Sequence, residues 1–227
     1  IGPVTDASEF DSEQGRDGVA GRLRGLSLES SGLNGQVESD AGLGYMEWTL
    51  VFRNDSPVQR EARAKIRLPP GGVVSRLTLW IDGEEREAAY GRREQVKAAY
   101  EKVVQQRRDP VLVSTSGRDE VMMQCFPVPP NGGAMKVKVG ITAPLALASK
   151  EEGLLRLPFF VERNFGISEP GGHDLALRGD SPLALPGRAQ SRVPDSGSGT
   201  ALKTGLTRDD ISGPVAVRVS RDPAARR

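Results

Sequence analysis

Cysteine and histidine are nearly absent from this chain, which has one of each, Cys125 and His173, in 227 residues. A single thiol excludes a disulfide within the chain, and with it the small secreted scaffolds that disulfides hold together. No His and Cys cluster has the spacing of a zinc site. No glycine-rich segment follows the strand–loop–helix pattern of a phosphate-binding loop.

An excess of either charge is missing too. Lys and Arg number 31 and Asp and Glu number 30, a net charge of +1. Phosphate binding needs a concentrated cationic face, so nucleic acid is not expected as the main partner. No apolar run reaches the ~18 residues of a transmembrane helix, so we expect no membrane insertion by this part of the protein.

The chain begins at Ile1 without the pattern of a signal peptide. We therefore expect a piece of a longer protein whose targeting and anchoring segments are absent here. An extracytoplasmic or membrane-anchored parent protein is favoured, while the compartment and the oligomeric state stay open.

Glycine and proline are plentiful, at 27 and 16 residues, which indicates many turns and a loop-rich β protein. Apolar and polar residues alternate in "YMEWTLVF" from Tyr45, in "REARAKIRL" from Arg60 and in "AMKVKVGI" from Ala134. A period of two predicts strands with one buried and one wet face, as in antiparallel sheets.

One segment, "REQVKAAYEKVVQQRRDP", has helical periodicity instead. Its apolar stripe consists of Val96, Ala99, Tyr100, Val103 and Val104, and Pro110 favours a stop. We expect a helix over about 92–107 that packs this stripe on a sheet.

The order of these pieces carries a resemblance. "FRNDSP" ends one strand, "RLPPGG" ends the next, "VVSRLTLWIDGEER" leads to the helix with Tyr100, and "MMQCFPVPPNGGAMKVKVGITAPL" follows. This succession, over about residues 45–165, resembles the VIT domain (vault protein inter-alpha-trypsin domain) family. The resemblance implies a mainly β, antiparallel β-sandwich-like domain with one amphipathic helix packed on a sheet.

The resemblance also implies a non-catalytic module, since family members occur in extracellular, vault-associated and bacterial envelope proteins and this domain is not known for catalysis. Their usual companion is a von Willebrand A domain, whose Asp-x-Ser-x-Ser metal site is missing from this chain, so such a domain is expected only elsewhere in the parent protein. We expect no cofactor, no metal and an unidentified protein partner.

Four regions are expected along the chain. Residues 1–44 are a polar N-terminal segment with weak strands, and 45–167 are the VIT-like domain. Residues 168–213 read as a Gly/Pro/Ser-rich loop or linker. Residues 214–227 hold a C-terminal edge strand and tail.

Two alternatives to a protein-interaction or scaffold module stay open. Cys125 and His173 form a candidate nucleophile and base of a cysteine-dependent enzyme, although Cys125 reads as a buried mid-strand residue and His173 as a loop residue. Arg178-Gly179-Asp180 matches the integrin-recognition tripeptide in a segment expected to be a loop, which suggests an adhesion module.

The remaining polar groups have plainer interpretations. Arg92, Arg93 and Lys97 give the expected helix a cationic face that suits an acidic partner. Glu84, Glu85 and Glu87 read as a solvated strand edge rather than a metal site. Asn54-Asp55-Ser56 has the form of a glycosylation sequon, but a turn cap is favoured.

Overall fold

A computed structural model describes residues 18–19, 21–81, 84–87, 90–91, 111–188, 191–194 and 199–222. Within these ranges the chain consists of strands and one short 3₁₀ helix, η1 (Asp210–Ser212). The strands are β1 (Leu26–Glu38), β2 (Leu43–Asn54), β3 (Arg60–Arg67), β4 (Val73–Ile81), β5 (Glu84–Glu87), β6 (Tyr90–Gly91), β7 (Val111–Gly117), β8 (Glu120–Val128), β9 (Gly133–Pro144), β10 (Ala146–Leu147), β11 (Glu152–Arg156), β12 (Phe159–Arg163), β13 (Gly166–Gly179), β14 (Leu183–Ala184), β15 (Ser191–Pro194), β16 (Thr200–Gly205) and β17 (Ala216–Ser220). The expected mainly β fold is confirmed.

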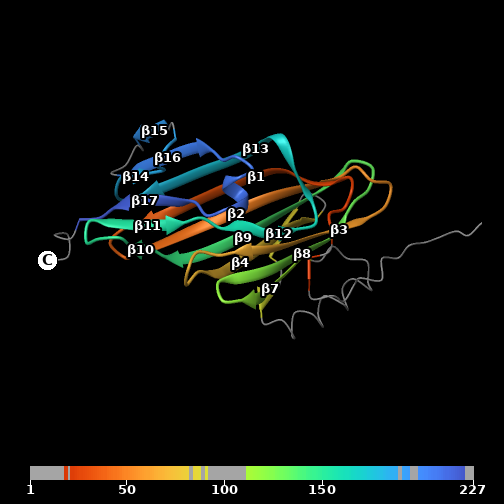
Figure 1. Cartoon of the computed structure of the whole chain (residues 1–227), viewed down its shortest axis with the longest axis horizontal. Helices are drawn as coiled ribbons and strands as arrows, with labels where there is room; N and C mark the ends of the chain where they lie inside the picture. Colours follow the sequence, from red (N-terminus) through yellow and green to blue (C-terminus); the bar gives the residue numbers. More distant parts are fainter. Residues whose placement is uncertain are drawn as a thin grey trace, which may run out of the picture.

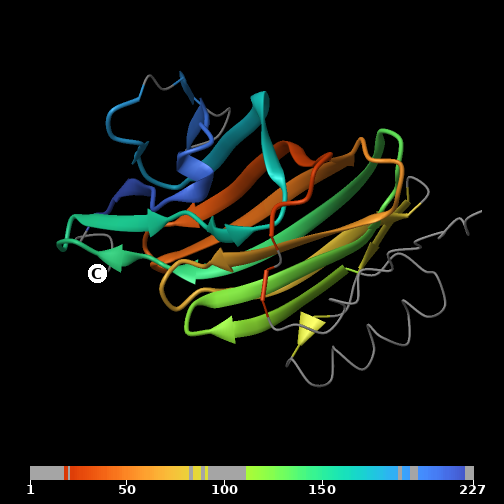
Figure 2. The ribbon, with the colours of Figure 1, turned by 45° about the vertical axis from the view of Figure 1, so that its right-hand side comes forward.

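The described strands form three sheets. A large sheet has the order β15-β16-β13-β1-β2-β9-β4-β5, and the two smaller ones have the orders β12-β3-β8-β7-β6 and β10-β11-β17-β14. Figures 1 and 2 show the smaller sheets on one side of the large sheet. Most pairs are antiparallel, but β1 pairs in parallel with β13, and β6 with β7. A parallel neighbour requires a crossover, and the chain between β1 and β13 contributes strands to all three sheets.

Alternation along β2 decides which face of the large sheet is buried. Met46, Trp48, Leu50 and Phe52 are at most 1 % exposed, while the residues between them are partly open to solvent. The period of two in the sequence predicted this split correctly, because successive strand side chains point to opposite faces.

Aromatic contacts join the layers. Trp48 on β2 lies 4.6 Å from Phe160 on β12 between ring centroids, and Phe52 lies 4.9 Å from Phe165. Phe160 and Phe165 also meet edge to face at 5.4 Å. Offset and edge-to-face aromatic pairs add to the burial of apolar area. The core therefore lies between the large sheet and the smaller ones.

The tail differs from its expected loop structure. Residues 166–179 form β13, which pairs with β1 on one side and β16 on the other, and β14, β15 and η1 follow before residue 213. Pro170 and two neighbouring glycines favoured the prediction of a loop in this segment. Pairing with β1, more than 100 residues away in sequence, and with β16 overrides such local preferences.

The two ends of the chain need corrections as well. Residues 26–38 form the long strand β1, which pairs along β2, where weak strands were expected. β17 lies between β11 and β14, so it is an inner strand and the expected edge strand is wrong. The predicted helix over 92–107 lies outside the described residues. No helix among the described residues is long and apolar enough to cross a membrane.

Candidate interaction surface on the large sheet

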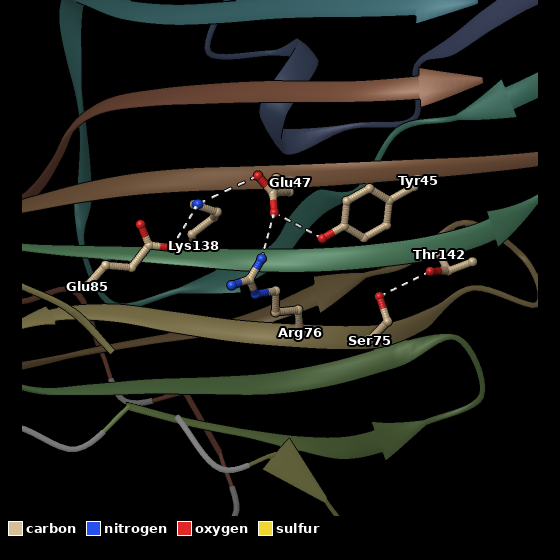
Figure 3. Close-up of polar contacts among 7 residues, drawn as sticks. All are labelled: Tyr45, Glu47, Ser75, Arg76, Glu85, Lys138 and Thr142. Atoms are coloured by element: carbon tan, nitrogen blue, oxygen red, sulfur yellow. Dashed lines mark hydrogen bonds and ion pairs between the residues drawn. The ribbon is translucent and has the colours of Figure 1, made fainter. Parts of the chain in front are cut away.

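The outer face of the large sheet is polar where β2, β9 and β4 run side by side. The register places Glu47 opposite Gly140 and Gly140 opposite Arg76, while Tyr45 and Val73 both lie opposite Thr142. All of these residues share one face, because strand pairing aligns residues of equal orientation. We call this region the outer-face cluster: Tyr45, Glu47, Ser75, Arg76, Glu85, Lys138 and Thr142 (Figure 3).

Glu47 is the centre of the outer-face cluster. Its carboxylate accepts a hydrogen bond of 3.0 Å from the Tyr45 hydroxyl, and it lies 3.9 Å from Arg76 Nη1 and 3.6 Å from Lys138 Nζ. Lys138 also reaches Glu85 on β5 at 3.3 Å. Figure 3 shows these side chains, from β2, β4, β5 and β9, converging on one face. Two cations around one carboxylate fix the position of each side chain more than an isolated surface pair does.

A glycine makes this arrangement possible. A Cβ on Gly140 would lie 2.9 Å from the Tyr45 hydroxyl oxygen and 2.8 Å from Arg76 Cβ. The Tyr45 side chain therefore reaches across β9 at a position where no side chain stands in its way. Glycine in a strand interior marks such close approaches.

The hydroxyl of Tyr45 stays protonated at neutral pH. Partial burial raises the pKa of Tyr45, and the hydrogen bond to the negative Glu47 raises it further, while Arg76 opposes the shift. A neutral phenol that donates to a carboxylate is a positioned hydrogen-bonding group, not an activated base. The arrangement favours recognition over proton transfer.

Cation–π contacts lie next to the outer-face cluster on the same face of the large sheet. Lys136 Nζ lies 4.0 Å from the centre of the Trp80 ring on β4, and Lys138 Nζ lies 5.3 Å from it. Both distances fall within the range of cation–π attraction. These contacts hold two lysines over one indole.

An apolar patch lies beside the cluster at one end of these strands. Leu43 is 44 % exposed, Tyr45 36 % and Val73 57 %. Leu43 pairs with the exposed Pro144, next to the row in which Tyr45 and Val73 flank Thr142. We call Leu43, Tyr45, Val73 and Pro144 the apolar patch. Thr142 donates a hydrogen bond of 3.0 Å to Ser75 at its border.

The tripeptide Arg178-Gly179-Asp180 is not in the expected loop. Arg178 and Gly179 are the last residues of β13, and Gly179 is buried between β1 and β16. Both carboxylate oxygens of Asp180 accept hydrogen bonds from the backbone N–H of Ser39, at 3.0 and 3.1 Å. The carboxylate is therefore engaged in joining two segments of the fold.

The proposed nucleophile and base lie in different sheets. Cys125 on β8 is fully buried, and burial together with the nearby Glu61 raises the pKa of its thiol far above the usual range. His173 is a buried residue of β13, not a loop residue, and its Nδ1 lies 3.0 Å from Ser31 Oγ. Burial lowers the pKa of His173. Neither residue is the other's hydrogen-bond partner.

The structure describes some of the remaining candidate residues and not others. Arg92, Arg93 and Lys97 lie outside the described residues. Glu85 is exposed and pairs with Lys138 across the strands, which fits the predicted solvated edge. No group of three or more metal-ligating side chains gathers within the part of the chain that the structure describes.

Asn54 is a structural residue and not an exposed sequon. It is fully buried, and its side-chain N–H₂ donates to the carbonyls of Val58 and Val128 at 2.8 and 3.0 Å. Its oxygen accepts from the N–H of Ser56 at 3.0 Å and from the Ser56 hydroxyl. This is the side-chain-to-backbone turn bonding that the sequence predicted.

Sequence reasoning did not find the outer-face cluster. The alternation on β2 and β9 placed Glu47 and Lys138 on wet faces, but nothing local showed that Arg76 and Tyr45 meet there. The available signal was Gly140 within an otherwise regular strand, since an isolated glycine in a strand pattern indicates a close approach.

Comparison with known proteins agrees with the resemblance read from the sequence. Residues 36–142 match the sequence model of the vault protein inter-alpha-trypsin domain. The match begins in β1 and ends in β9. β12, β13, β15 and β16 complete two sheets that the matched segment begins, while the sheet β10-β11-β17-β14 lies wholly after it. A search of curated proteins gave no match.

Some solved structures are similar to this chain at very low identity. A Legionella pneumophila protein proposed to bind nutrients has a TM-score of 0.51 at 6 % identity, over 88 % of this chain and 68 % of that one. Yeast LTA4 hydrolase has a TM-score of 0.49 at 8 % identity, over 87 % of this chain and 29 % of that one.

An M1 zinc metallopeptidase from Deinococcus radiodurans has a TM-score of 0.43 at 12 % identity, over 87 % of this chain and 42 % of that one. This chain thus spans less than half the length of the two enzymes, and these likenesses say nothing about activity. The family match is independent of them: residues 36–142 of this chain are identified as a vault protein inter-alpha-trypsin domain by the family's sequence model.

Proposed function

We propose that this chain is a non-catalytic protein-interaction module of a larger, membrane- or envelope-associated protein. The observation that carries the proposal is the exposed apolar patch directly beside the outer-face cluster. Protein interfaces combine an apolar centre with a polar rim, and tyrosine, tryptophan and arginine are enriched in them. Tyr45, Arg76 and Trp80 are residues of these types on one face.

Preorganisation strengthens this proposal. Contacts with Glu47 hold Tyr45, Arg76 and Lys138 in place before any partner binds. Binding then costs less side-chain entropy than it does for freely moving surface residues. An acidic or mixed-charge protein surface with an apolar centre is the complement of this face. The cationic residues Arg92, Arg93 and Lys97 would extend the same preference for acidic partners.

The two alternative functions have less support. A cysteine nucleophile needs a thiolate and a neighbouring base, whereas burial keeps the thiol of Cys125 protonated and the Nδ1 of His173 faces Ser31. An adhesion tripeptide needs its carboxylate free, whereas Asp180 binds the backbone of Ser39. A von Willebrand A domain elsewhere in the parent protein fits an interaction role and is part of this proposal.

The experiment compares two matched charge substitutions. Val73→Lys places a charge in the apolar patch, and Val58→Lys places the same charge at another exposed valine, 50 % exposed. Proteins captured from the producing organism by the immobilised chain are identified, purified and titrated against each variant by calorimetry. We expect Val73→Lys and Arg76→Glu to weaken binding at least tenfold and Val58→Lys to leave it unchanged.

Two results would overturn the proposal. Equal binding by Val73→Lys and the unsubstituted protein would remove the apolar patch from the interface. A turnover activity that disappears in Cys125→Ala would establish catalysis instead.

A further inference from the structure

Three arginines from distant parts of the sequence meet at the end of β12. Arg22 precedes β1, Arg163 is the last residue of β12, and Arg208 lies two residues before η1. The backbone N–H of Leu23 donates a hydrogen bond of 2.7 Å to the carbonyl of Asn164, which places Arg22 beside Arg163. Figure 2 shows this red N-terminal segment passing the connection between β12 and β13.

Two further contacts show that the three arginines lie near the end of β12. Arg22 Nη2 would lie 3.5 Å from a Cβ on Gly166, the residue that begins β13 just after Arg163. The helix η1, which follows Arg208, packs against β12. The N-terminal segment, β12 and the η1 segment therefore each bring one guanidinium to the same region.

Arg163 is poorly compensated there. Its side chain is half-buried, and its Nε is buried without a hydrogen-bond partner among the described residues. Burial lowers the pKa of Arg163, and the positive charges of Arg208 and Arg22 lower it further. A half-buried cation facing two other cations is unfavourable unless an anion compensates it.

Neighbouring carboxylates do not supply this compensation. Glu162 pairs with Lys65 at 3.1 Å, and Asp210 pairs with Arg188 and accepts a hydrogen bond of 2.6 Å from the N–H of Thr207. Asp209 follows Arg208 but forms no ion pair within the described residues. The buried hydroxyl of Ser212, on η1, also has no hydrogen-bond partner among the described residues.

We propose that Arg22, Arg163 and Arg208 form a binding site for a doubly charged tetrahedral oxyanion, a phosphate or sulfate group. Guanidinium groups present planar pairs of N–H donors that match the oxygens of such groups. Three cations suit a dianion better than a single carboxylate. The site lies on β12 in a smaller sheet, apart from the outer-face cluster, so it is independent of the function proposed above.

The test uses inorganic phosphate, inorganic sulfate, O-phosphoserine and acetate as probes. Each is titrated by calorimetry at pH 8 and fixed ionic strength against the whole chain and its variants. Arg163→Gln and Arg208→Gln each remove one cation, and Arg118→Gln is the control, since the Arg118 side chain is 98 % exposed at a distant turn. We expect one saturable site that both site variants weaken at least tenfold and the control retains.

The ranking of probes identifies the source of the group. Tighter binding of O-phosphoserine than of phosphate supports an ester on a macromolecule, and the reverse supports a free ion. Binding of acetate as tight as that of phosphate, no saturable binding, or full binding by both site variants would each overturn the proposal.

Stability without any anion is a second readout. Removal of an uncompensated cation should leave Arg163→Gln melting at or above the temperature of the unsubstituted chain. A purely structural Arg163 would lower that temperature, and this result would also overturn the proposal.

Discussion

Gly140 and Tyr45 fit together across two neighbouring strands: a Cβ on Gly140 would stand 2.9 Å from the Tyr45 hydroxyl oxygen. That oxygen donates its hydrogen bond to Glu47, which Arg76 and Lys138 also approach. The missing side chain on β9 thus decides where an aromatic ring on β2 lies. The exposed polar face depends on this space.

Gly140→Ala tests this relationship. The added methyl group would displace Tyr45 and Arg76, and overpacking costs about 1–3 kcal/mol. The control is Gly32→Ala on β1, where a Cβ meets only Asn34 Nδ2 at 3.6 Å. Urea unfolding should show a loss of stability for the first variant and no loss for the second. Equal stability of the two variants would contradict the proposed fit.

Asn54→Asp should destabilise the chain by about 1–3 kcal/mol, because a carboxylate oxygen would replace the buried N–H₂ that donates to two carbonyls. Asn131→Asp is the matched control at an exposed turn position with a φ of 57°. Asparagine and aspartate both tolerate this backbone conformation. Chemical unfolding of the two variants measures the difference. A silent Asn54→Asp would mean that its amide is not the buried donor described here.

Asp180→Ala should cost about 1–3 kcal/mol, because it leaves the backbone N–H of Ser39 without its acceptor. Asp174→Ala, which removes an exposed carboxylate from β13, the strand that ends just before Asp180, should have little effect. Thermal unfolding followed by circular dichroism compares them. If integrin-type receptors bind the chain and Asp180→Ala abolishes that binding without loss of stability, the adhesion function gains the support it now lacks.

Cys125 should make stability fall at alkaline pH. Burial raises the pKa of its thiol in the folded state, so the folded chain keeps a proton that the unfolded chain releases above about pH 8.5. The stability contributed by the protonated thiol is complete below that pH and declines above it by up to about 1.4 kcal/mol per pH unit.

Cys125→Ala provides the comparison, since every other titrating group is shared. Unfolding free energies from pH 7 to 10 should fall more steeply for the unsubstituted chain than for the variant. Parallel curves, or fast labelling of the native thiol by a small reagent at pH 7, would show that Cys125 is accessible.

The sequence by itself determined the strand character of the central region and which face of each strand is buried. Trp48 and Glu47 went to opposite faces because strand side chains alternate, and this rule needs no knowledge of the partner strand. The motif order in residues 45–165 also indicated the family correctly. Asn54 was readable as a turn residue because its contact with Ser56 is local.

Only the tertiary structure decided what pairs with what. β13 contains Pro170 and neighbouring glycines, so its local pattern predicts a loop, yet β1 and β16 hold it as a strand through pairing over about 140 residues of sequence for β1. The same holds for both sites. Glu47 meets Arg76 and Lys138 because sheet register brings their strands together. Arg163 meets Arg22 and Arg208 because the segments before β1 and at η1 pack against the end of β12. In neither site does sequence spacing carry information about the contact.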